Sequence, residues 1–185
     1  MAKAVLFDLD GVLVDTYDLW FHLINTVARR LGCPPVPAEV YRPTFGQGLE
    51  ADIDRFYPGF TVDQIRAQYD LYYDAHLVHL KAIEGAAAAL RSIALPKAVI
   101  TNSPTGAARL ALRKVNLEGY FQTVVGSDQV AASKPAPDEV FEACRRLGVT
   151  PAEALVVGDS RFDEGAAKAA GAPFVWFRSF AELKI

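Results

Sequence analysis

Short runs of apolar residues recur along the chain and alternate with stretches whose apolar positions repeat at helical spacing. The runs are rich in Val and Ile and contain no regular polar position, which is typical of parallel strands covered on both faces. We predict such strands at 3–7, 98–100, 123–125, 155–157 and 174–177. Helical spacing predicts helices between them, at 86–93, 105–115, 138–147 and 162–170.

This alternation of strand and helix predicts the fold class. It favours an α/β fold with a Rossmann-like, doubly wound parallel sheet and right-handed crossovers. In such sheets ligands bind beyond the carboxyl ends of the strands. The residues that follow each predicted strand are therefore the candidates for a functional site.

The segment 16–81 interrupts the alternation, because it shows helical periodicity and no convincing strand. Two apolar helix faces can be traced in it, formed by Trp20, Leu23, Ile24, Val27 and Leu31, and by Ile65, Tyr69, Tyr72, Tyr73, His76 and Leu80. We predict a helical cap domain at 16–81, inserted into an α/β core domain made of 1–15 and 82–185. Since the insertion follows the first strand directly, the cap should lie over the end of that strand as a lid.

Composition narrows the class of function. The 185 residues are 51% hydrophobic and 22% charged, as in globular proteins, and the net charge of −3 comes without the basic stripe that nucleic-acid binding requires. No apolar run is long enough to span a membrane, and the first residues do not resemble a secretory signal. The two cysteines, Cys33 and Cys144, lie far apart, which favours free thiols. We expect a cytoplasmic protein that binds neither nucleic acid nor membranes.

Asp8 and Asp10 end the first predicted strand and are followed by Gly11, which allows a sharp turn. In an extended geometry both carboxylates would point the same way. One carboxylate could attack phosphorus while the other donates and takes up a proton, because carboxylate nucleophiles form aspartyl-phosphates. Alone, an Asp-x-Asp pair at a strand end is weak evidence.

Three further motifs follow predicted strands. Thr101-Asn102-Ser103 offers hydroxyl and N–H groups that can hold phosphate oxygens, or that simply cap the next helix. Lys134 could balance phosphate charge and keep a nucleophile ionised. Asp159 and Asp163 stand at a helix entrance, and several carboxylates around one hard cation favour Mg²⁺.

Together these motifs resemble the four signature motifs of the haloacid dehalogenase superfamily, in order and in spacing, over nearly the whole chain. The first is the run Phe7-Asp8-Leu9-Asp10-Gly11-Val12-Leu13-Val14-Asp15-Thr16. The inserted helices resemble the cap of the phosphoglycolate-phosphatase-like and β-phosphoglucomutase-like branch. The resemblance implies the core strand order 5-4-1-2-3.

The resemblance also implies a role for each motif residue. Asp8 would be the nucleophile and a magnesium ligand, and Asp10 the general acid/base, with its backbone carbonyl on the metal. Asp159 would be a direct ligand, and Asp163 would support the metal and Lys134. Thr101, Asn102 and Lys134 would bind phosphate oxygens. The implied activity is hydrolysis of a small phosphorylated metabolite.

Two rival activities follow from the same resemblance. Dehalogenases of the superfamily lack the second aspartate, so Asp10 argues against that chemistry. Mutases of the β-phosphoglucomutase type carry a hinge histidine where this chain has Trp20, with His22 two positions further on. Their cap loop also holds an arginine that 45–50 lacks. Hydrolysis is favoured, with a mutase or a pyrophosphatase as alternatives.

The cap residues carry the choice of substrate, and the sequence leaves that choice open. Gln47 in the cap loop is the candidate we select, with Arg42 and Arg55 as further groups able to recognise a carboxylate or hydroxyl. The oligomeric state is also open, between a monomer and a weak homodimer.

Overall fold

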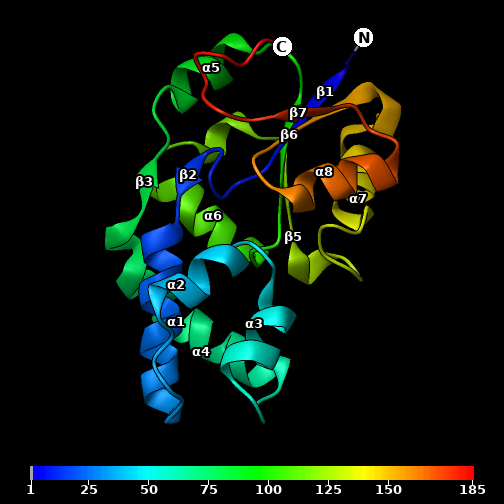
Figure 1. Ribbon diagram of the computed structural model, residues 1–185. Coiled ribbons are helices and arrows are strands. Elements are labelled where there is room, and N and C mark those ends of the chain that lie inside the picture. The colour runs from blue at the N-terminus through cyan, green and yellow to red at the C-terminus, as the bar shows by residue number, and fades with distance from the viewer. Residues whose placement is uncertain (1) are drawn as a thin grey trace.

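The computed structural model describes residues 2–185, and its centre is a parallel sheet of five strands (Figure 1). Each strand lies at one of the five predicted apolar runs, with ends that differ from the predicted ends by a few residues at most. The strands are β1 (Ala4–Phe7), β4 (Lys97–Thr101), β5 (Thr123–Gly126), β6 (Ala154–Gly158) and β7 (Phe174–Trp176).

The order across the sheet is β5-β4-β1-β6-β7, with β1 in the centre and every pair parallel. Numbered among these five strands alone, the order from the β7 edge is 5-4-1-2-3, as the resemblance implies. The central position of β1 brings its carboxyl end between those of β4 and β6. The motifs that follow these strands therefore meet at one edge of the sheet.

Both faces of the sheet are covered by helices, which confirms the doubly wound α/β class. Successive residues of β1 enter opposite cores: Phe7 packs with Leu112 of α6 on one face, and Leu6 packs with Val140 of α7 on the other. This explains why the strands lack a polar period. The covering helices are α5 (Ala86–Ser92), α6 (Thr105–Lys114), α7 (Asp138–Leu147) and α8 (Arg161–Ala170).

The segment between β1 and α5 forms a group of helices beyond one end of the sheet, drawn in blue to green-cyan in Figure 1. Its longest helices, α1 and α4, pack along each other. Leu23 and Ile24 of α1 and Ile65 of α4 are fully buried. The helices and 3-10 turns are α1 (Tyr17–Leu31), α2 (Ala38–Tyr41), η1 (Arg42–Thr44), α3 (Leu49–Phe56), α4 (Val62–His76) and η2 (Leu77–His79). Within 2–185, no helix combines the length and the apolar character needed to cross a membrane.

Two short strands that the sequence did not reveal connect the helical group to the sheet. β2 (Val14–Asp15) pairs antiparallel with β3 (Lys81–Ala82). Lys81, which we expected at the end of the helical insertion, thus belongs to a strand; a run of two residues carries no detectable period. The pairing brings the two chain crossings side by side. The assignment of 1–15 with 82–185 and of 16–81 to separate domains stays a prediction.

Three short 3-10 turns complete the described elements. They are η3 (Glu118–Tyr120), η4 (Ser127–Gln129) and η5 (Pro151–Glu153).

Candidate active site

Asp8, Lys134 and Asp163 form a buried ion cluster at the carboxyl end of β1. The Lys134 ammonium lies 2.7 Å from Asp8 Oδ1 and 2.6 Å from Asp163 Oδ1. It also donates to the carbonyl of Ile100 at 3.3 Å, at the carboxyl side of β4. Four separate parts of the chain therefore converge on one ammonium group. The structure brings together Asp8, Lys134 and Asp163 as the four-motif pattern requires.

The charges of this cluster are not balanced. Burial, reinforced by the neighbouring Asp163 carboxylate, raises the pKa of Asp8 well above its ordinary value, and the Lys134 ammonium only partly opposes this. Burial alone would lower the pKa of Lys134, but the Asp163 and Asp8 carboxylates outweigh it and raise that pKa. Lys134 therefore stays charged, and a second cation beside Asp8 would favour its ionised form.

Asp159 completes an all-oxygen cluster that fits a magnesium ion. Asp8, Asp159 and Asp163 each offer a carboxylate oxygen, and these oxygens lie within 4.8 Å of one another. Burial, with the Asp163 and Asp10 carboxylates, raises the pKa of Asp159 to about 6. A divalent cation would relieve this repulsion, and hard oxygen ligands are the set that Mg²⁺ prefers. The donor set and the uncompensated charge both fit the implied metal.

Asp163 is bound by protein groups on both oxygens. Its Oδ1 faces Lys134, while its Oδ2 accepts from the backbone N–H of Ser160 at 3.0 Å and from the Ser160 hydroxyl at 2.5 Å. Asp8 and Asp159 keep an oxygen free for a metal. The geometry is thus consistent with direct ligation by Asp8 and Asp159 and a supporting role for Asp163.

Two glycines let the backbone approach these carboxylates. A Cβ at Gly11, whose φ is +83°, would lie 2.0 Å from Asp159 Oδ2. A Cβ at Gly158 would lie 2.3 Å from the Cβ of Asp163. Only glycine fits at either position.

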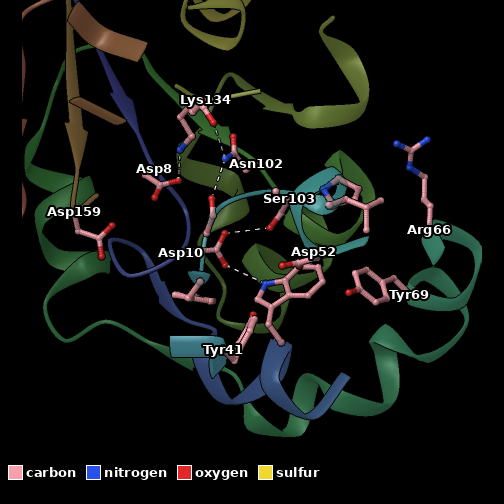
Figure 2. Close-up of a pocket in the computed structure, with 16 residues that line it drawn as sticks. Asp8, Asp10, Tyr41, Asp52, Arg66, Tyr69, Asn102, Ser103, Lys134 and Asp159 are labelled. Carbon is pink, nitrogen blue, oxygen red and sulfur yellow. Dashed lines mark hydrogen bonds and ion pairs between the residues drawn. The ribbon is translucent and has the colours of Figure 1, made fainter. Parts of the chain in front are cut away.

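The Asp10 side chain points away from Asp8, toward the helical group (Figure 2). It accepts hydrogen bonds from Thr16, from Trp20 Nε1 at 3.4 Å, and from the hydroxyls of Thr101 at 3.2 Å and Ser103 at 3.1 Å. The expectation that both carboxylates point the same way is wrong, because β1 ends at Phe7 and strand alternation no longer applies. A carboxylate held apart from the ion cluster is available to move protons.

The polar groups of the Thr101 motif bind other protein groups in this structure. The hydroxyls of Thr101 and Ser103 both orient Asp10. Asn102 Nδ2 donates to the carbonyls of Gly46 at 2.9 Å and Lys134 at 3.1 Å, so it joins the helical group to the core. Asn102 Oδ1 is buried and has no partner within 2–185. Phosphate binding by Thr101 and Asn102 stays a prediction.

A pocket lies between the ion cluster and the helical group. It is lined from the core by Asp8, Asp10, Asn102, Ser103, Pro104, Lys134 and Asp159, and from the helices and their loop by Trp20, Tyr41, Phe45, Gly46, Gly48, Leu49, Asp52, Arg66 and Tyr69. The core side of the pocket is thus rich in charge, and the helical side is mostly aromatic or apolar apart from Asp52 and Arg66 (Figure 2).

The residues of the predicted cap that we selected from the sequence do not line this pocket. Gln47 reaches it only through Asp52, because its Nε2 donates to Asp52 Oδ1 at 3.0 Å. The guanidinium groups of Arg42 and Arg55 lie over the rings of Tyr17 and Phe56, with centroid distances of 4.6 and 5.8 Å. The sequence therefore directed attention to the loop, whereas the packing of α3 and α4 places Asp52 and Arg66 at the pocket.

Arg66 and Asp52 are charged residues of the helical group that line the pocket and that the sequence did not reveal. Burial raises the pKa of Asp52 to about 7, and the bond from Gln47 partly opposes this. Arg66 shares a helical face with Tyr69, which was recognised only as an apolar position. Its Nε is buried without a partner in the described chain, and its ion pair with the exposed Asp63 is long, at 3.5 Å.

Glu139 is a buried carboxylate of α7 that no motif predicts. It is fully buried and neither oxygen has a hydrogen-bond partner within 2–185. Burial raises its pKa to about 7, although Lys134 partly opposes the shift. Its ordinary pKa is 4.5, so its ionisation destabilises the fold progressively as pH rises from about 4.5 to 7 and by a constant amount above that.

We therefore expect Glu139→Gln to remove part of the pH dependence of stability. Between pH 5 and 8 the free energy of unfolding of the wild type should fall by about 2 kcal/mol more than that of the variant. Urea unfolding at both pH values measures this, with the exposed Glu39→Gln as the control. If the free energy of unfolding changes with pH in the same way in the wild type and in the Glu139→Gln variant, the raised pKa of Glu139 is contradicted.

Comparison with known proteins agrees with this geometry. The family model described as "Haloacid dehalogenase-like hydrolase" matches residues 5–177. The chain belongs to this family. The match covers both the sheet and the inserted helices, and it confirms the resemblance found in the four motifs. The chain is accordingly an enzyme of a hydrolase family.

Individual relatives cover nearly the whole chain. A phosphoglycolate phosphatase of Neisseria meningitidis is 34% identical over 187 residues, which cover 91% of this chain and 77% of the relative. One of Rhodobacter capsulatus is 35% identical over 185 residues, covering 95% and 84%. The crystal structure of CbbY from Rhodobacter sphaeroides in complex with phosphate superimposes with a TM-score of 0.86 at 25% identity, covering 98% and 96%.

Proposed function

We propose that this haloacid dehalogenase-like hydrolase is a magnesium-dependent phosphatase. It hydrolyses a small phosphate monoester through an aspartyl-phosphate on Asp8. The observation that carries the proposal is the Asp8 carboxylate, held by Lys134 at 2.7 Å beside an all-oxygen cluster and open to the pocket. The similarity to phosphoglycolate phosphatases supports the same class of reaction.

The reaction divides into two displacements at phosphorus. One oxygen of the Asp8 carboxylate attacks phosphorus, and the bond to the leaving oxygen breaks. Asp10, protonated for this step, gives its proton to that oxygen. Asp10 then takes a proton from water, which attacks the aspartyl-phosphate, releases phosphate and restores the Asp8 carboxylate.

The other residues of the site hold these groups and balance charge. Asp8, Asp159 and the Asp10 backbone carbonyl would hold magnesium, which when bound would neutralise charge on the phosphate oxygens and on Asp8. Lys134 orients Asp8, and Asp163 with Ser160 orients Lys134. Thr16, Trp20, Thr101 and Ser103 orient Asp10 toward the leaving group.

The position of His22 favours hydrolysis over a mutase reaction. His22 is exposed on α1 and does not line the pocket, whereas Trp20 lines it and donates to Asp10. Trp20 cannot exchange protons as a hinge histidine would. A panel of substrates tests the two alternatives, which are transfer of a phosphoryl group between two positions of a sugar phosphate and cleavage of pyrophosphate.

We propose phosphoglycolate as the first substrate to test, because Arg66 is placed to bind its carboxylate. Arg66→Gln should raise KM for phosphoglycolate about tenfold or more, as loss of a charged hydrogen bond does. Hydrolysis of p-nitrophenyl phosphate, which has no carboxylate, should change little.

Steady-state kinetics of both substrates, with Arg55→Gln as the matched control, measure the difference. Equal effects of Arg66→Gln on both substrates would contradict recognition of a carboxylate. If the wild type prefers another phosphate ester of the panel, that ester replaces phosphoglycolate as the proposed substrate. The phosphatase assignment stays in place.

A further inference from the structure

All three histidines of this chain lie together, outside the candidate active site. His22 comes from α1, His76 ends α4 and His79 ends η2. The ring centroids are 4.2 Å apart for His22 and His79, 6.0 Å for His76 and His79, and 6.5 Å for His22 and His76. No part of the phosphatase proposal uses them.

The ring nitrogens of this cluster are available for a ligand. None of the three imidazoles forms a hydrogen bond or an ion pair with any residue of 2–185. His22 is exposed, and His76 and His79 are half-buried, so solvent and ions can reach the cluster.

The ring centres lie near the spacing of three imidazoles around one transition-metal ion, while the ring nitrogens as placed do not all lie within 4.8 Å of one another. With metal–nitrogen bonds of about 2.1 Å and tetrahedral angles, the ring centres of three ligands lie roughly 5 Å apart. The observed centroid distances lie on both sides of that value. The rings now stack, with interplanar angles of 6° to 25°, so they would turn about their side-chain torsions to aim one nitrogen each at the ion.

We propose that His22, His76 and His79 form a binding site for a transition-metal ion such as Zn²⁺, separate from the acidic cluster at Asp8. Three imidazoles with water in the fourth position make a tetrahedral site. Imidazole favours Zn²⁺, Ni²⁺ or Cu²⁺ over Mg²⁺, which prefers oxygen ligands. The two sites therefore select different metals.

An ion at this site would tie together the two ends of the helical group. His22 lies shortly after β2, and His79 lies shortly before β3, the two strands through which the chain crosses to the sheet. α1 already packs against η2. A bound ion would add a link between these elements beside the paired crossings and would restrain their motion.

Calorimetric titration of tag-free protein with Zn²⁺, in excess Mg²⁺, tests the proposal. The Asp159→Asn background removes a ligand from the acidic cluster, so that binding there does not obscure the result. We expect one Zn²⁺ per chain and a raised Tm. His22→Gln or His79→Gln removes a direct ligand. Loss of an outer-shell partner weakens metal binding by about 10–100-fold, so loss of a direct ligand should weaken Zn²⁺ binding at least as much.

Asp70→Asn, an exposed change on α4, serves as the matched control and should leave Zn²⁺ binding unchanged. Hydrogen exchange adds a readout of position: Zn²⁺ should protect amides of residues 77–82 in the Asp159→Asn protein and not after His79→Gln. Equal Zn²⁺ affinity with and without the three histidines would overturn the proposal. So would binding that leaves these amides unprotected.

Discussion

Asp8→Asn is expected to lower kcat by roughly 10⁴-fold or more, because the amide cannot form the phosphoenzyme. The fold should survive, since the amide keeps the shape of the carboxylate and the site now holds more negative charge than Lys134 can balance. In the absence of magnesium the variant should unfold at the same Tm as the wild type or higher, because burial and Asp163 disfavour ionised Asp8. Phosphate release and thermal unfolding measure the two effects.

Two companion variants sharpen this result. Asp18→Asn changes an exposed acid of α1 and should leave the rate unchanged. Asp10→Asn should cost roughly 10²–10⁴-fold, as loss of a general acid or base does. That loss should be smaller for p-nitrophenyl phosphate than for an alkyl phosphate, whose leaving oxygen needs the proton more. An Asp8→Asn protein with the wild-type rate would refute the covalent mechanism.

Removal of magnesium is expected to abolish turnover, and Mg²⁺ but not Ca²⁺ should restore it. The acidic cluster would otherwise repel the phosphate dianion, and Asp8 would lack the charge that its attack requires. Calcium takes more ligands at longer distances and would misplace the attacking oxygen, so it should inhibit. Rates in excess chelator, followed by titration with each ion, measure this.

Asp159→Asn provides the internal control for the metal. It should raise the concentration of Mg²⁺ that gives half the maximal rate, since it removes a ligand that is not the nucleophile. Asp15→Asn, which changes an exposed acid of β2, should leave that Mg²⁺ concentration unchanged. Full activity of the wild type in excess chelator would contradict the magnesium site.

The sequence alone determined the class of fold and the charged end of the site. Continuous apolar runs predicted five parallel strands, because residues buried on both faces leave no polar period. The carboxyl ends of such strands share one edge of the sheet, so the residues after them had to be neighbours. Asp8, Lys134, Asp159 and Asp163 could be selected on that basis, together with the resemblance to the family.

Only the tertiary structure decided the other end of the pocket and the direction of Asp10. Local periodicity says which face of α4 is apolar, but not that Arg66 lines the pocket while Gln47 donates to Asp52. The direction of Asp10 depends on hydroxyls from Thr101 and Ser103, far away in sequence. The meeting of His22, His76 and His79 likewise depends on how α1 packs against α4 and η2. Such contacts between distant segments carry no signal in local sequence, because shape and packing across the whole fold determine them.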